Sequence, residues 1–189
     1  MRDDEFARFD ERADVLASVE LLDVCAPLLG QRPGLWKWMI VGAQSALQGA
    51  MVCALVDSTG TSVLEKRSAA ETLDWLQADD DKRGERPREK LDYFDNLLQK
   101  CIGQLGLVLA ASERKDIDRL HEEFRNSFIH FTPKGWSIET VGLPRIIGVA
   151  LKVIEKLMRQ DKVMMHLEDD QLEAFSKSLA SVRTNLKLT

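Results

Sequence analysis

Apolar residues recur every three or four positions along most of the chain, which is the spacing of amphipathic α-helices. The first such stretch covers residues 4–26, and its inward line consists of Val15, Val19, Leu22 and Ala26. The second covers residues 36–56 and is rich in glycine and alanine, which predicts a central helix with close neighbours. Since no run of strands separated by turns is found, we expect an all-α protein in which residues 1–189 form a single-domain up-and-down helical bundle.

Five further helices are expected. A short helix at residues 68–77 begins with the capping-box residues Ser68 and Glu71, and the charged loop 78–90 follows it. The next helix carries Pro87 in its first turn, where proline is favoured, and an apolar line at Leu91, Phe94, Leu98, Cys101 and Leu105. The remaining helices are expected at 113–131, at 144–160 and from Glu168 onward, with an extended arm at 134–140.

The helix expected at 113–131 has two distinct faces. Ser112 is a suitable N-cap, and Pro133 closes the far end. The core face consists of Ile117, Leu120, Phe124, Phe128 and Phe131. With each residue advancing by about 100° around the axis, the opposite face collects Arg125, Asn126, Ile129 and His130. An isoleucine among polar groups indicates that this face is also covered, most simply by a second copy of the chain.

The segment Arg125-Asn126-Ser127-Phe128-Ile129-His130 resembles the signature of the HEPN superfamily, in which an arginine and a polar residue, often asparagine, precede a histidine. The resemblance covers these six residues and their helical setting. It implies a HEPN-like helical bundle that forms a homodimer, with the last helix as an additional C-terminal element. Active members are metal-independent ribonucleases whose two motifs meet across the dimer interface. A toxin or defence effector of this kind would also have an antitoxin-like protein partner.

These residue types suit RNA cleavage without a metal or another cofactor. His130 would activate the ribose 2′-hydroxyl, because imidazole titrates near neutral pH. Arg125 would hold the phosphoryl oxygens, because its guanidinium stays charged and binds two oxygens at once. Asn126 lies one turn before His130, where its amide would orient the imidazole or a substrate oxygen. The products would be a 2′,3′-cyclic phosphate and a 5′-hydroxyl.

Other interpretations of the same residues stay open. In a structural one, Arg125 pairs with Glu122 and His130 caps the helix end. In another, the protein is a non-catalytic dimer that binds RNA or protein and regulates it. A metal-dependent enzyme would use Glu122, Asn126 and His130, although no pair of histidines has metal-ligand spacing. Arg114 and His121 also match the loose HEPN spacing, and we interpret that match as accidental.

Several residues outside the motif are candidates for substrate contact, each with a structural alternative. Gln44 and Gln48 would either contact substrate or satisfy each other at the core edge. The aromatic candidates would either stack on bases or anchor helix ends, and they are Trp36, Trp38 and Trp136. The basic candidates would either bind phosphates or be solvated, and they are Arg83, Arg86, Arg88 and Lys134.

Composition narrows the choice of partners. The formal charge of −5 argues against a general grip on nucleic acid, so we expect no DNA binding and only local RNA contacts. The acidic amino terminus is unlike a secretory signal, and no apolar run is long enough to suggest a membrane span. We therefore expect a cytoplasmic protein. The three cysteines, Cys25, Cys53 and Cys101, lie within apolar helices and are expected to be small buried hydrophobes.

Overall fold

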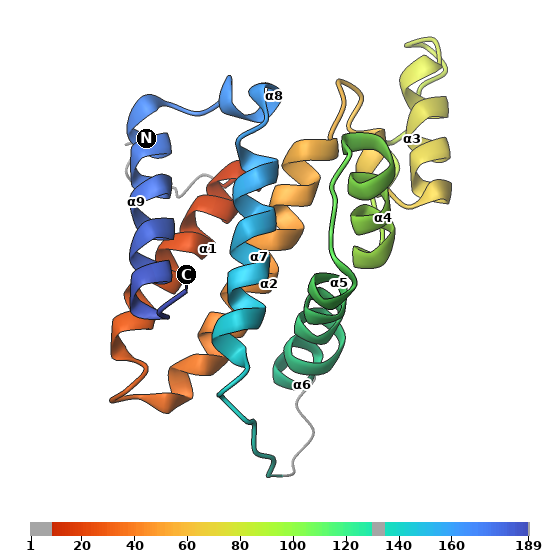
Figure 1. Ribbon diagram of the computed structural model, residues 1–189. Coiled ribbons are helices and arrows are strands. Elements are labelled where there is room, and N and C mark those ends of the chain that lie inside the picture. Colours follow the sequence, from red (N-terminus) through yellow and green to blue (C-terminus); the bar gives the residue numbers. More distant parts are fainter. Residues whose placement is uncertain (1–8, 130–134, 189) are drawn as a thin grey trace, which may run out of the picture.

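The structure is a computed structural model that describes residues 9–129 and 135–188 (Figure 1). Its longer helices are α1 (Glu11–Cys25), α2 (Trp36–Leu55), α3 (Lys66–Gln77), α4 (Phe94–Leu105), α7 (Leu143–Met158) and α9 (Asp169–Asn185). Between α4 and α7, a helical rod consists of α5 (Ala111–Asp118), the π-helix η5 (Arg119–Arg125) and α6 (Asn126–Ile129). The short elements are η2 (Ala26–Leu28), η3 (Pro33–Leu35), η4 (Thr61–Val63) and α8 (Asp161–Met164). No strand occurs in the described ranges, and the predicted all-α class is confirmed.

The helices α1 and α2 run antiparallel and approach each other closely. A Cβ atom on Gly42 would lie 3.1 Å from Leu22 Cδ2, and one on Gly49 would lie only 2.7 Å from Val15 Cγ2. The expected inward line of α1 is buried, with Val15 and Leu22 fully inaccessible to solvent. Because Gly42 and Gly49 of α2 have no side chains, the backbones of α1 and α2 can pack closely against each other.

The helices α7 and α9 complete a four-helix core, in which α9 covers α1 and α7 covers α2 (Figure 1). Arg183 Nη2 of α9 donates to Glu155 Oε2 of α7 at 2.6 Å. Beyond the end of α9, Leu188 packs on Gly148 of α7. These contacts orient α9 antiparallel to α7, and the predicted apolar line of the last helix docks on the core.

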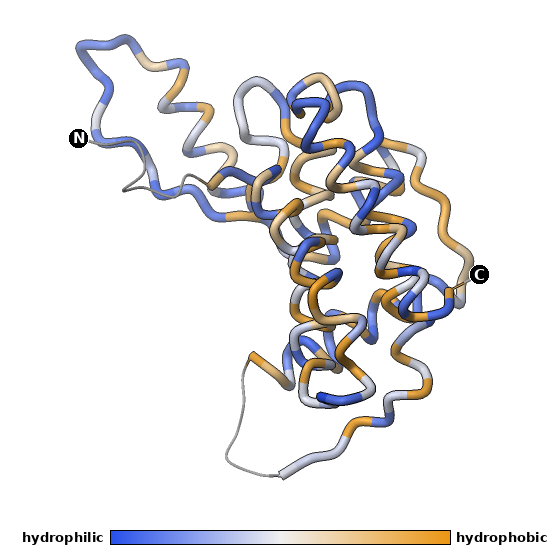
Figure 2. Tube along the Cα trace, turned by 90° about the vertical axis from the view of Figure 1, so that its left-hand side faces the viewer, coloured by the Kyte–Doolittle hydropathy of each residue, from blue (hydrophilic) through white to orange (hydrophobic). Residues whose placement is uncertain are grey.

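The central position of α2 explains its apolar composition. By length and composition alone, the segment Pro33–Leu55 could span a membrane, contrary to the expectation from the sequence. However, 67% of its most apolar window is buried, because α1, α4, α7 and η5 pack around α2. Burial inside the protein thus accounts for these apolar residues without a bilayer. Figure 2 shows the hydrophobic positions concentrated along the packed helices.

The helices α1 and α3 begin at residues other than those predicted. Residues 9 and 10 are outside α1, and Asp10 caps the helix, since its Oδ1 accepts from the backbone N of Ala13 at 2.8 Å. The predicted capping box of Ser68 is wrong, because Ser68 lies inside α3. Its hydroxyl instead accepts from the backbone N of Lys90 at 2.9 Å and thereby joins α3 to the end of the charged loop.

The helix predicted from Pro87 begins later, at Phe94. The preceding residues are extended, because Leu64 and Leu91 form an isolated antiparallel bridge and the backbone N of Glu65 donates to Lys90 O at 2.9 Å. Leu91 is consequently 39% exposed instead of buried in the core. Pairing between distant residues has here overridden the local helical pattern.

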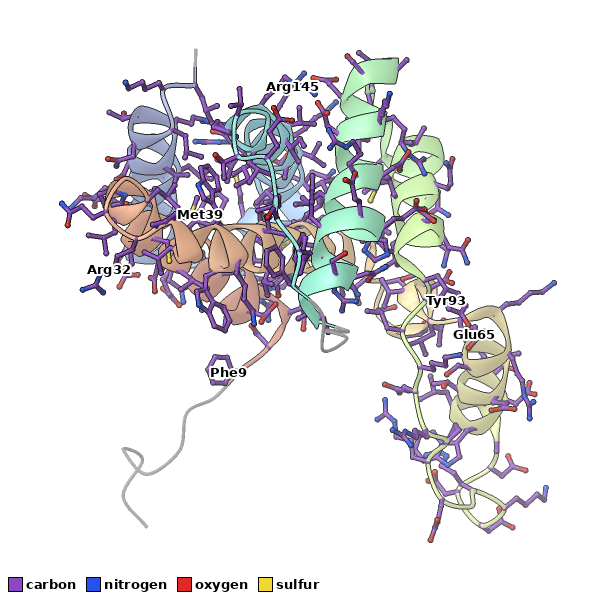
Figure 3. All side chains as sticks on the ribbon, turned by 90° about the horizontal axis from the view of Figure 1, so that it is seen from below. Phe9, Arg32, Met39, Glu65, Tyr93 and Arg145 are labelled. Atoms are coloured by element: carbon purple, nitrogen blue, oxygen red, sulfur yellow. The ribbon has the colours of Figure 1, made fainter. Side chains whose placement is uncertain are left out.

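The helix α3 and loop 78–90 form an arm that projects from the core, and the arm is largely hydrophilic (Figures 2 and 3). Arg83 orders this arm from within. Its Nε donates to Trp75 O at 3.2 Å, its Nη2 donates to Ala78 O at 3.0 Å, and its guanidinium lies 4.9 Å from the Trp75 ring centroid. Arg83 therefore satisfies the last carbonyls of α3, and Arg86 pairs with Glu89.

All three cysteines are buried thiols, as expected. Burial raises the pKa of Cys53 and of Cys101 to about 12. Both therefore remain protonated and unreactive at neutral pH.

We expect Gly49→Ala to destabilise the protein by about 1–3 kcal/mol, because the new methyl group would force Val15 and α1 away from α2. The free energy of unfolding in urea measures this effect. Gly103→Ala in α4 is the matched control, since a Cβ there meets no atom within 4 Å and should stabilise the helix by about 0.5–1 kcal/mol. Equal effects of the two substitutions would contradict the proposed close contact.

Candidate functional site

The helical rod that carries the motif is fixed to α7 by two ion pairs. Arg145 pairs with the buried Asp116, and Lys152 Nζ lies 2.7 Å from Glu113 Oε1. Glu113 also accepts from the backbone N of Ala110, so the helix is capped there and not at the predicted Ser112. The predicted core face is confirmed at its described positions, where three residues are buried and a fourth is partly buried: Ile117, Leu120, Phe124 and Phe128. Phe131 lies outside the described residues.

The π-helix η5 changes which residues of the rod face α2. Hydrogen bonds in a π-helix connect residue i to i+5, so each residue advances less around the axis than the 100° of an α-helix. Over the seven residues of η5, this difference turns Arg125 toward α2. Constant α-helical spacing predicted that Arg125 is directed away from the core, but Arg125 is half-buried beside α2.

Arg125 lines a groove of about 430 Å³ between the start of α1, one face of α2 and the rod. We call it the glutamine groove, because Gln44 and Gln48 of α2 form part of its wall. The carboxylates of Asp10, Glu11 and Asp14 line it from the α1 side. The charged residues of the groove thus come from two sides, with the arginine contributed by the rod and the acidic residues by α1.

The guanidinium of Arg125 is held by a neutral partner. Its Nη1 donates to Asn126 Oδ1 at 3.0 Å. Within the described residues Arg125 forms no ion pair, so the alternative in which it pairs with Glu122 is not realised there. Ile129 is 46% exposed, and His130 lies outside the described residues, as does Lys134. The structure thus brings Arg125 and Asn126 together and leaves the predicted role of His130 untested.

His121 lies between Gln44 of α2 and Phe94 of α4. Its ring stacks on Phe94, with centroids 4.1 Å apart and planes 9° from parallel. Gln44 Nε2 lies 3.4 Å from His121 Nδ1 and donates to Gln48 Oε1 at 2.9 Å. Burial and then the charge of Arg125 lower the pKa of His121 below its usual value. A neutral His121 with an accepting Nδ1 fits this arrangement.

The two glutamines therefore satisfy each other, as the structural alternative held, and also line a groove. No role was expected for His121, although its spacing of four residues from Arg125 was the available signal. Asp14 and the exposed Leu91 were not expected at a site either, and they reach the groove through tertiary contacts. Arg114, the other half of the accidental match, pairs instead with Asp118 and Asp95.

The tryptophan candidates lie elsewhere. The ring of Trp136 packs on Phe128 at a centroid distance of 4.7 Å, so it covers the end of the rod. Trp36 packs partly buried against the core, and Trp38 is 46% exposed beside Lys37. For a metal, the described residues contain no group of three histidine, cysteine, aspartate or glutamate side chains suited to hold one.

We expect Arg125→Gln to raise the pKa of His121, because the substitution removes a positive charge that disfavours the imidazolium. NMR titration of the His121 ring measures this shift. Because the pKa of His121 is lower in the folded than in the unfolded state, its contribution to stability is complete above about pH 6.5 and is lost as the pH falls toward the folded value. The variant should lose less stability over that window.

Arg119→Gln is the matched control, because Arg119 also lies in η5 but pairs with Glu123. It should leave the titration of His121 unchanged. An unchanged pKa in Arg125→Gln would show that the guanidinium does not face His121.

Comparisons of this chain with protein-family models, with curated proteins and with solved structures found no match. The resemblance to the HEPN superfamily therefore rests on the motif residues themselves.

Proposed function

We propose that this chain is a HEPN-like, metal-independent endoribonuclease that acts as a homodimer in the cytoplasm. Its four-helix core would be a HEPN-like up-and-down bundle to which α9 adds a C-terminal helix. Arg125, Asn126 and His130 would form the catalytic group, and RNA would be cut to 2′,3′-cyclic phosphate and 5′-hydroxyl ends. A role as a toxin or defence effector, neutralised by an antitoxin-like protein, is part of the proposal.

The pairing of Arg125 with a neutral amide carries this proposal. Other arginines of the same rod are neutralised by carboxylates, since Arg114 pairs with Asp118 and Arg119 pairs with Glu123. Arg125 instead donates to Asn126 and, among the described residues, keeps an uncompensated charge beside a groove. Such a guanidinium is suited to bind a phosphate that gains negative charge in the transition state.

The backbone around the motif also supports a functional role. The π-helix η5 ends at Arg125, immediately before Asn126. A π-helix is less stable than an α-helix and occurs frequently at functional sites, where it re-aims particular side chains. Here Arg125 is the last residue of η5 and lines the glutamine groove.

A non-catalytic dimer that binds RNA or protein is the second candidate. The acidic side of the groove favours it, because Asp10, Glu11 and Asp14 would repel a phosphate placed near α1. In this alternative Arg125 would anchor a partner without bond cleavage, and the two candidates differ in whether RNA is cut.

We expect His130→Ala to lower RNA cleavage by at least about 100-fold, the usual contribution of a general base, and Arg125→Ala to have a similar effect. Cleavage of labelled RNA with a chelator present, and analysis of the product ends, measure both. His166→Ala and Arg119→Ala are the controls, since these residues lie outside the groove. Undiminished cleavage by His130→Ala would exclude the proposed mechanism, and binding without any cleavage would favour the second candidate.

We expect Ile129→Asp to dissociate the proposed dimer, because Ile129 is exposed on the motif-bearing rod and a carboxylate there would be desolvated at the interface. Sedimentation equilibrium measures the mass. Val108→Asp is the control, as Val108 is 77% exposed in the loop before the rod and should tolerate a charge. A wild-type chain that sediments as a monomer would contradict the dimer.

A further inference from the structure

The glutamine groove presents a hydrogen-bond donor whose direction is fixed. Gln44 Nε2 donates to Gln48 Oε1 at 2.9 Å, so the oxygen of Gln48 already has a partner. Gln44 is itself only 4% exposed and is braced by His121. The amide group of Gln48 is thereby oriented, and its Nε2 can donate to a ligand in the groove.

An acceptor lies next to this donor. Ser45 Oγ donates to Asp14 Oδ2 at 3.3 Å, which ties the carboxylate of α1 to α2. A Cβ atom on Gly49 would lie 3.5 Å from the same Asp14 Oδ2, so the carboxylate extends over the residue that follows Gln48. The groove is therefore lined by a carboxylate acceptor and an amide donor that come from two different helices.

The groove also offers apolar surface for a flat ring. Phe9 is 72% exposed at its rim, and its side chain stands clear of the helices in Figure 3. Leu91 lines the groove as well and is 39% exposed. Bases of single-stranded RNA bind by stacking on such side chains while their edges form hydrogen bonds. A volume of about 430 Å³ lies within the range of small-ligand sites.

The charges that line the groove determine how a nucleotide would be oriented in it. A phosphate is favoured beside Arg125 and disfavoured beside Glu11 and Asp14, so a nucleotide would place its base toward α1. An acceptor beside a donor matches adenine and cytosine, in which an exocyclic amino group adjoins a ring nitrogen that accepts. Uracil carries a keto oxygen in place of that amino group and would face the Asp14 carboxylate with an unfavourable acceptor.

We propose that the glutamine groove binds one base of the RNA and selects adenine or cytosine over uracil. Asp14 accepts from the exocyclic amino group, and Gln48 donates to the adjacent ring nitrogen. This inference rests on the proposed RNA substrate, and it assigns base selection to residues outside the Arg125–His130 motif. Gln44 acts as a positioning residue, because it orients Gln48 without facing the reacting atoms.

Binding of nucleoside 3′-monophosphates tests the groove without any cleavage. Adenosine and inosine monophosphates differ in two adjacent groups: inosine has a keto oxygen in place of the amino group, and its neighbouring ring nitrogen carries a hydrogen instead of accepting one. Cytidine and uridine monophosphates differ in the same way. We expect the amino member of each pair to bind the full chain more tightly by about tenfold or more, because the keto member loses the hydrogen bonds to Asp14 and Gln48. Calorimetry gives the affinities, and NMR shifts of the Gln48 side-chain amide locate the site.

Asp14→Asn should reduce the preference, because an asparagine amide can turn its NH₂ group toward a keto oxygen, whereas the contact of Gln48 with the ring nitrogen is retained. Gln48→Leu should weaken binding of adenosine and cytidine monophosphates by about tenfold. Asp23→Asn, on α1 outside the groove, is the control and should change neither value. Unfolding midpoints of all variants verify that each is folded.

Equal affinity for the amino and keto members, or no binding of any nucleotide, would overturn the inference. The proposed function fails separately. Selective binding without RNA cleavage would retain the groove and exclude the nuclease, whereas RNA cleavage that is indifferent to base and to Asp14→Asn would retain the nuclease and exclude base selection.

Discussion

The close packing around α2 is the constraint on which the remaining structure depends. α1 lies so near that Gly49 has no room for a methyl group, while α4, α7 and η5 cover other sides of α2. A helix enclosed in this way must be apolar almost all round, and any polar side chain on it must find a partner within the protein. Gln44 and Gln48 meet this requirement through each other and through His121. The hydrogen bonds that make the buried amides acceptable thus also connect the central helix to the rod that carries Arg125.

The contacts of the rod with its neighbours constrain two residues of η5. His121 lies against Gln44 and Phe94, and Phe124, three residues later, is buried in the core. The wider turn of η5 accommodates both contacts and, in doing so, brings Arg125 to the groove. The position of the arginine is therefore set by the packing of its neighbours one turn earlier and not by the motif alone.

Much of the fold follows from the spacing of apolar residues, because a helix that packs on one face must repeat every three or four positions. This spacing located α2 and α7 almost to the residue and identified the buried positions Val15 and Ile117. It was wrong at the starts of α3 and α4, where Ser68 and Leu91 bond to residues distant in the chain. It could not foresee η5 either, since a helical wheel assumes one constant angle. The site could be predicted only in part for the same reason: Arg125 and Asn126 are visible as a motif, whereas Asp14 and His121 join it through tertiary contacts.

The distribution of charge around the rod explains how a chain with a net charge of −5 could act on RNA. Carboxylates neutralise Arg114 and Arg119 on the rod and Arg145 and Lys152 on α7, so these cations hold the structure together and offer little to a phosphate. Arg125 pairs with an amide, which orients the guanidinium without cancelling its charge. The carboxylates of Glu11 and Asp14 in the groove disfavour a phosphate near α1, whereas the oriented guanidinium of Arg125 favours one beside the rod. Under the proposed function, such an arrangement predicts weak general affinity for RNA, so that discrimination between RNA sites would come from contacts to the bases and not from the backbone charge.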